Sequence, residues 1–194
     1  MDELPTGTVM LFRSTVLKSS IAIIASALSL SVNANVASYT EVGLGAAKWH
    51  STSNSSYSEI DPSAALKVSA GARLSQDIGH WFDLSLIAES SKRLGDDKVT
   101  SYYLLPSYKY TSNPIAPRAY FAKVGAGLLF AKDENTTLNE TKNSRETVYL
   151  AAIGTSQKLS ERQSVTFEFQ TTYLDNAGVD LFNNVFTISI SQYL

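Results

Sequence analysis

The chain offers few groups for acid–base or nucleophilic chemistry, because it contains two histidines and no cysteine. One histidine, His50, is followed by hydroxyl and carboxyl groups at Ser51, Ser53, Glu59 and Asp61. A nucleophilic hydrolase brings a histidine, a hydroxyl and a carboxylate within hydrogen-bond reach of one another. Serine-rich segments of this kind are usually only solvated, so we do not predict catalysis at His50.

The second histidine, His80, lies beside Trp81 in a short polar segment. We expect it to be a polar residue at an interface and not a ligand. The chain has no motif for binding zinc, a nucleotide or a phosphate. We therefore expect no metal and no cofactor.

A larger set of candidate residues consists of charged side chains that recur at alternate positions of otherwise apolar segments. It contains four acids and four bases: Glu41, Lys67, Arg73, Asp83, Glu89, Lys109, Lys123 and Glu168. Small residues such as Gly43, Ser69 and Gly125 lie between them. Because buried charges are costly unless they are paired, the balance of signs predicts an ionic network inside the fold.

The segments that carry these charges alternate with a period of two, which is typical of β-strands. We predict eight strands, near 39–48, 64–75, 81–89, 99–110, 118–130, 147–157, 163–174 and 184–194. Short connections at 76–80, 111–117 and 158–162 alternate with longer ones at 49–63, 90–98, 131–146 and 175–183. This asymmetry and the even strand number predict an all-β fold, an eight-stranded antiparallel up-and-down transmembrane barrel.

The other face of the predicted strands carries no charge. It includes Val42, Leu44, Leu66, Val68, Phe82, Leu84, Leu86, Tyr102, Leu104, Tyr108, Tyr110, Tyr120, Val124, Leu128, Phe130, Val148, Leu150, Ala152, Phe167, Phe169, Phe186, Ile188 and Ile190. A soluble barrel would turn this face inward, but the interior of eight strands is too narrow for so many large side chains. We therefore predict that the uncharged face contacts lipid and that the charges plug the interior.

Two features depart from this alternation. Pro106 lies inside a predicted strand, where it costs a ladder bond or marks a bulge. Several apolar residues fall on the charged face, namely Ile87, Tyr103, Leu105, Phe121, Leu129, Tyr149 and Ile153. Bulges that shift the register would explain them.

The first 34 residues have the order of a secretory signal. Arg13 and Lys18 precede an apolar run at 21–30, and small residues lead up to Ala34. A run of ten residues, two of them serine, is too short to span a bilayer as a helix. We predict a signal peptide at 1–34 and a barrel at 35–194, with export to a bacterial outer membrane. A net charge of −2 gives no basic field for nucleic acid.

The run Ala119–Leu128 (AYFAKVGAGL) and the final segment Phe186–Leu194 (FTISISQYL) resemble strands of OmpA-like outer-membrane barrels. That family usually ends in an aromatic residue, whereas this chain ends in Leu194. The resemblance implies a barrel whose final strand is recognised by the barrel-assembly machinery during biogenesis. It also implies that outer-membrane lipid, including lipopolysaccharide, surrounds the barrel. We expect a monomer with a non-enzymatic role in envelope integrity or in surface interaction through the long loops.

Two alternatives to this role remain open, a narrow channel and an acyl hydrolase acting on lipid A or phospholipid. The stretch 173–178 (YLDNAG) is similar to the His-x-Ser-Asn-Ala-Gly stretch of the lipid A 3-O-deacylase family. Tyr173 and Asp175 stand where that family has its catalytic histidine and serine. We interpret the stretch as a turn.

Overall fold

The computed structural model describes residues 37–51, 61–74, 79–92, 98–113, 116–135, 140–176 and 179–194. The predicted signal peptide at 1–34, Ser53 and Glu59 lie outside these residues. No helix in the described part of the chain is long and apolar enough to cross a membrane. The described residues form eight strands: β1 (Ser38–Ser51), β2 (Ser63–Arg73), β3 (His80–Lys92), β4 (Lys98–Ser112), β5 (Arg118–Asn135), β6 (Glu140–Lys158), β7 (Gln163–Asn176) and β8 (Val179–Tyr193).

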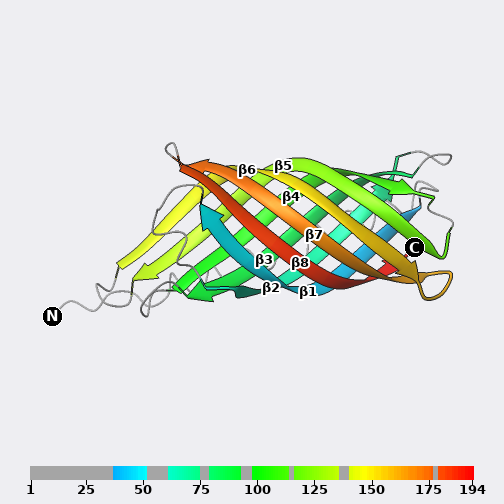
Figure 1. Ribbon diagram of the computed structural model, residues 1–194, viewed down its shortest axis with the longest axis horizontal. Coiled ribbons are helices and arrows are strands. Elements are labelled where there is room, and N and C mark those ends of the chain that lie inside the picture. The colour runs from blue at the N-terminus through cyan, green and yellow to red at the C-terminus, as the bar shows by residue number, and fades with distance from the viewer. Residues whose placement is uncertain are drawn as a thin grey trace.

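The strands form one closed barrel in chain order, in which each strand pairs antiparallel with its neighbours (Figure 1). The amide of Leu194 donates to the carbonyl of Ser38 over 3.0 Å, so both ends of the described chain lie at the end with the short turns. The predicted eight-stranded up-and-down barrel is confirmed.

The strands are strongly tilted, as Figure 1 shows. Pairing partners followed once around the barrel from Tyr39 lead back to β1 at Trp49, ten residues further along the strand. Partners therefore climb from the short-turn end toward the long-loop end as one goes from β1 through β2 to β8. Residues at a common height are consequently diagonal neighbours on adjacent strands.

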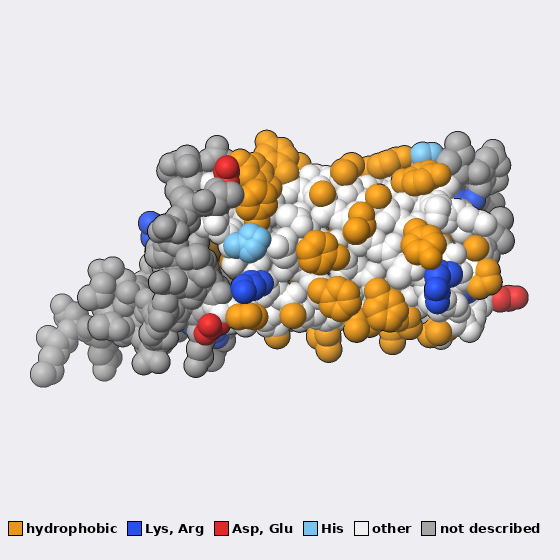
Figure 2. All heavy atoms as spheres, viewed as in Figure 1, with side chains coloured by type: hydrophobic (Ala, Val, Ile, Leu, Met, Phe, Trp, Pro, Cys, Tyr) orange, Lys and Arg blue, Asp and Glu red, His pale blue; other side chains and the backbone are white. Residues whose placement is uncertain are grey.

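The distribution of side chains is the reverse of that in a soluble protein. Large apolar residues such as Leu44, Val124 and Ile190 are more than half exposed on the outer wall. Charged residues such as Lys67 and Asp83 are fully buried inside. On the face in Figure 2, hydrophobic side chains cover the wall between the two ends, and charged side chains lie near those ends. Such a wall suits hydrocarbon, because a closed sheet leaves no backbone group unpaired there.

Aromatic residues border this apolar wall at both ends. Tyr102 and Phe130 are 43% and 41% exposed toward the long-loop end. Toward the short-turn end the exposed aromatic residues are Phe82, Tyr108, Tyr110 and Tyr120. The two belts match the interfacial girdles expected of a membrane barrel.

The predicted orientation of β6 is wrong. Val148, Leu150 and Ala152, which we assigned to the lipid face, are buried, whereas Tyr149 and Ile153 are 58% and 64% exposed. β6 is apolar on both faces, so its alternation did not identify the inner one. The register does: Ala152 is opposite the inward-pointing Lys123, and residues directly opposite in adjacent strands share a face.

The other apolar residues on the charged face point inward without any shift in register. Tyr103, Leu105 and Leu129 are buried members of the interior cluster. The pairs Leu104↔Leu128 and Ser107↔Gly125 lie on either side of Pro106 in the same register. Pro106 therefore interrupts the ladder with β5 but makes no bulge, and the bulge prediction is wrong.

Two predicted long connections are largely strand. β5 continues to Asn135 and β6 begins at Glu140, so most of 131–146 belongs to a hairpin that extends past the other strands (Figure 1). Similarly, Asn176 at the end of β7 pairs with Val179 at the start of β8. Residues 141–145 are exposed to solvent regardless of the face they occupy. A strand that is wetted on both faces carries no hydrophobic alternation, so sequence patterning could not find it.

Candidate functional site

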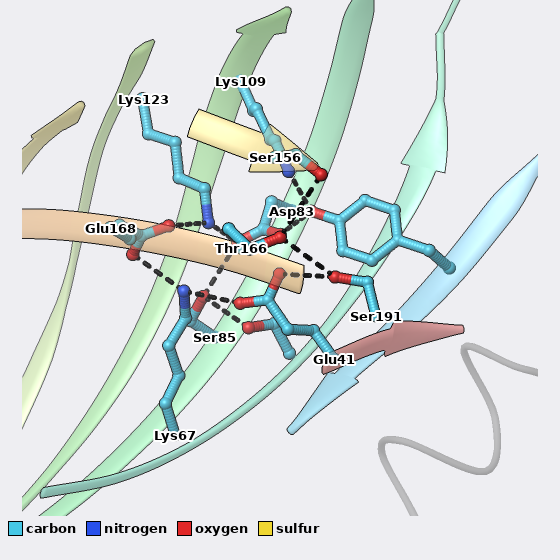
Figure 3. A network of polar contacts seen from close by, with 12 residues as sticks. Glu41, Lys67, Asp83, Ser85, Lys109, Lys123, Ser156, Thr166, Glu168 and Ser191 are labelled. Carbon is cyan, nitrogen blue, oxygen red and sulfur yellow. Dashed lines mark hydrogen bonds and ion pairs between the residues drawn. The ribbon is translucent and has the colours of Figure 1, made fainter. Parts of the chain in front are cut away.

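The main polar cluster of the interior is a layer of six charged side chains, which we call the ionic layer. Six different strands contribute to it, each from an inward position: Glu41, Lys67, Asp83, Lys109, Lys123 and Glu168. All six are at least nine-tenths buried. Figure 3 shows their charged ends converging.

Two lysines bridge three carboxylates into a chain of ion pairs. Lys67 Nζ lies 2.8 Å from Glu41 Oε1 and 2.7 Å from Glu168 Oε1. Lys123 Nζ lies 2.8 Å from Glu168 Oε2 and 3.2 Å from Asp83 Oδ1. Glu168 therefore holds both lysines, one on each carboxylate oxygen.

Lys109 joins the layer through a tyrosine. Its ammonium donates to Tyr39 Oη over 3.1 Å, and that hydroxyl donates to Asp83. Lys109 Nζ also lies 4.5 Å from the ring centroids of Tyr39 and Phe121. These contacts stabilise its charge by cation–π attraction.

The ionic layer carries no net charge, because three carboxylates face three ammonium groups. Hydroxyl groups occupy further carboxylate sites: Ser85 donates to Asp83 over 2.8 Å, and Ser191 donates to Glu41 over 3.0 Å. Burying an ion is tolerable only when partners and hydrogen bonds replace its water. A layer in this state fills the interior with fixed, mutually satisfied charges.

The remaining two residues of the predicted network lie elsewhere on the strands. Arg73 is the last residue of β2 and only partly buried, and its backbone amide donates to the carbonyl of Ala37 over 2.9 Å. Glu89 lies on β3, six residues beyond Asp83 toward the long-loop end, and is 4% exposed.

Glu89 is held by neutral donors in place of a lysine. Its Oε1 accepts hydrogen bonds from Trp49 Nε1 and Tyr103 Oη, each over 2.8 Å. Asn183 Nδ2 lies 3.0 Å from both carboxylate oxygens. Sequence reasoning missed Trp49 and Asn183, because both lie in segments that we predicted to be loops. The inward position of Tyr103 was visible only as an exception to the alternation.

Apolar side chains separate Glu89 from the ionic layer. On β3, Ile87 lies between Ser85 and Glu89, and on β4, Leu105 lies between Ser107 and Tyr103. Both are almost fully buried in one cluster with Leu150 and Val185. Small residues and ion pairs therefore fill only part of the interior, contrary to our expectation, and apolar packing fills the part nearer the long loops.

Some glycines of the inner face are required because the backbones of neighbouring strands lie close together, and not because interior side chains need the space. A Cβ on Gly45 would overlap the carbonyl oxygen of Phe186 on the paired strand β8, and one on Gly125 would overlap that of Pro106 on β4. The backbones of neighbouring strands approach too closely there for a side chain.

The two histidines lie apart from the interior. His50 Nε2 is 3.1 Å from Asn184 Nδ2, and its ring lies 6.3 Å from that of Phe182. His80 is hydrogen-bonded to the hydroxyl of Tyr108 and lies against the ring of Tyr110, within the short-turn girdle. The partners that the structure gives His50 are thus an amide and an aromatic ring.

The stretch at 173–178 lies where β7 and β8 meet. Tyr173 Oη donates to Asp180 Oδ1 over 2.7 Å across the two strands. Ala177 and Gly178 lie outside the described residues. Within the described ranges, no group of three or more His, Asp and Glu side chains is placed to hold a metal ion.

Replacing Glu89 tests whether its carboxylate is a buried acceptor. We expect Glu89→Leu to lower the free energy of unfolding by about 1–3 kcal/mol or more, since buried donors at Trp49 and Tyr103 lose their acceptor. Glu89→Gln keeps one oxygen and should lose less. Urea titration followed by tryptophan fluorescence measures both variants. Equal stability of Glu89→Leu and wild type would contradict this description of the site.

Solved structures with the same architecture supply a comparison. Neisserial surface protein A (NspA) superposes with a TM-score of 0.67 at 13% identity, covering 80% of this chain and 97% of NspA. OprG from Pseudomonas aeruginosa gives 0.62 at 8% identity, covering 82% and 96%. Ail, the attachment invasion locus protein of Yersinia pestis, gives 0.56 at 10% identity, covering 82% and 99%.

The sequence itself matches neither a protein-family model nor a curated protein. At these identities the structural likeness shows the fold alone. The chain has the fold of the small eight-stranded outer-membrane β-barrels, as we predicted from the sequence.

Proposed function

We propose that this protein is a monomeric barrel of a bacterial outer membrane, exported by a signal peptide at residues 1–34, with a non-enzymatic role at the cell envelope. It stabilises the envelope or makes surface contacts through its long-loop end. Its partners are the surrounding lipid, including lipopolysaccharide, and the barrel-assembly machinery during biogenesis.

The outer wall supports the location. Residues such as Leu44, Ile153 and Ile190 are at least 60% exposed, which water would penalise and hydrocarbon would not. The closed sheet has no free edge strand through which a second copy could pair. A single chain can therefore reside in the bilayer by itself.

The observation that carries the proposed role is the buried ionic layer, in which three acids and three bases balance one another. Lys67, which joins Glu41 to Glu168, has no exposed surface. A pore would need its charges to be wet, and a hydrolase would need a carboxylate or hydroxyl free to react. Here the charges of the ionic layer are held by one another and by neighbouring hydroxyl groups, which favours a rigid scaffold for the loops.

Folding into lipid and recording conductance tests this role. We expect a purified sample to migrate differently on SDS gels before and after heating, as a folded barrel does. We expect planar bilayers containing it to show no discrete conductance steps. Discrete conductance steps from heat-modifiable protein would favour the narrow channel over a plugged interior. A chain that stays soluble after removal of residues 1–34 would refute the membrane barrel.

The hydrolase alternative has its own assay. We expect no release of fatty acid from lipid A or phospholipid incubated with the folded protein in detergent. Acyl release that disappears in His50→Ala would contradict the non-enzymatic role.

A further inference from the structure

A second group of charges lies on the outside of the barrel, just beyond the long-loop aromatic belt. Tyr102 on β4 is opposite Phe130 on β5, which is opposite Arg145 on β6. Tyr102 and Phe130 are exposed on the outer wall, so Arg145 faces outward too. Lys132 lies two residues beyond Phe130 and Lys98 four residues beyond Tyr102, and strand alternation places both on the same face.

These three cations lie at one height. The row Thr100↔Lys132↔Asn143 climbs toward the long-loop end, as every row of partners does from β4 to β6. Lys98 is two residues further toward that end than Thr100, and Arg145 is two residues nearer the apolar wall than Asn143. The tilt is thereby offset, and Lys98, Lys132 and Arg145 form a level arc across three strands.

The arc combines charge with an apolar base. Arg145 Cζ lies 5.7 Å from the ring centroid of Phe130, which holds the guanidinium at the edge of the belt that faces the long loops. Lys132 forms an ion pair with Glu134, so the arc and that carboxylate together carry two excess positive charges. Lys98 and Arg145 are exposed. On the β7–β8 side, the outer rim carries Tyr173 and the acid Asp180 instead.

We propose that Lys98, Lys132 and Arg145 bind the phosphate groups of a lipid headgroup in the leaflet at the long-loop end. This inference rests on the proposed membrane location. Aromatic belts lie at headgroup level, so cations directly beyond them meet phosphate and not hydrocarbon. A guanidinium binds phosphate through two parallel hydrogen bonds, and the lysines add point charge. The acyl chains of the bound lipid would follow the apolar wall below Phe130.

The excess of two charges favours a headgroup with more than one phosphate, such as that of lipid A. A lipid with one phosphate and one amine would leave the arc only partly neutralised. The site is thus expected to discriminate by phosphate number and not by acyl chain length.

Native mass spectrometry of the folded protein, released from detergent after incubation with lipid, measures this binding. The probes are bis-phosphorylated lipid A, dephosphorylated lipid A and inorganic phosphate as a competitor. We expect wild type to retain bis-phosphorylated lipid A, and the triple variant Lys98→Gln, Lys132→Gln, Arg145→Gln to bind it roughly tenfold or more weakly, because several charge-assisted contacts are lost. Dephosphorylated lipid A should bind wild type as weakly as the phosphorylated form binds the triple variant.

Lys48→Gln is the matched control, because Lys48 is an exposed base on β1, outside the arc. Equal retention by the triple variant and wild type would overturn the site, as would an equal loss in Lys48→Gln. Displacement of the lipid by millimolar inorganic phosphate would assign the site to free phosphate and overturn the lipid assignment. Heat-modifiable migration is scored on every sample: a folded barrel that binds no lipid A refutes the site alone, whereas a chain that does not fold into lipid refutes the proposed function.

Discussion

Lys67→Met is expected to lower the free energy of unfolding by about 3–5 kcal/mol, the cost of removing one partner from a buried ion pair. Lys67 has no exposed surface and its ammonium lies within 2.8 Å of carboxylate oxygens of both Glu41 and Glu168. Without it, three buried carboxylates face two lysines, and water cannot reach the uncompensated charge. Urea unfolding in lipid vesicles, followed by the fluorescence of the buried tryptophans, measures the loss.

Two further variants separate charge from packing. Lys158→Met removes an exposed base at the short-turn end and should change stability by no more than about 0.5 kcal/mol. Glu41→Gln added to Lys67→Met restores equal numbers of acids and lysines, and should recover part of the loss. If Lys67→Met unfolded like Lys158→Met, the interior charges would be hydrated, and the channel alternative would gain over the plug.

Ile153→Arg is expected to cost about 1–3 kcal/mol. A cation on the lipid face of a membrane barrel costs about 2–4 kcal/mol at the bilayer midplane and about 0–1 kcal/mol near the interfaces. Ile153 lies between these depths, five residues from the short-turn end of β6. Ile153 is 64% exposed on the outer wall and lies opposite Ala122 and Phe169. The sequence pattern had placed this side chain inside, so the variant also tests the corrected orientation of β6. The same urea titration in vesicles measures the effect.

Ile153→Leu provides the comparison for that variant, because it keeps the apolar surface and should leave stability nearly unchanged. A tryptophan at position 153 should be quenched by brominated lipid, since it would face the acyl chains. Full stability of Ile153→Arg together with an unquenched tryptophan would show that this side chain does not contact lipid.

Patterning along the chain was sufficient for the architecture and for most of the inner charges. Glu41, Lys67 and Asp83 alternate with apolar neighbours, and a period of two assigns all three to one face whatever the rest of the chain does. The narrowness of an eight-stranded interior then decided that this face points inward. The same face carries four acids and four bases, which was sufficient to predict a balanced interior.

Local alternation failed where both faces of a strand had the same character. β6 is apolar on both sides from Val148 to Ile153, and 141–145 is polar on both sides. Neither segment alternates between apolar and polar residues, so a pattern with a period of two cannot show which face points inward. Their placement follows from pairing with the neighbouring strand β5, which a pattern read along β6 alone does not include.

The sequence by itself determined a barrel of eight strands with charge inside and hydrocarbon-compatible residues outside, because alternation is a local property that each strand expresses alone. The tertiary structure decided which donor meets which acid. Lys67 and Glu168 are 101 residues apart in sequence, and Asn183 and Glu89 are 94 residues apart. It also decided that Lys98, Lys132 and Arg145 lie at one height. These contacts depend on the stagger with which eight tilted strands close into a ring, and that stagger is a condition on the whole sheet at once.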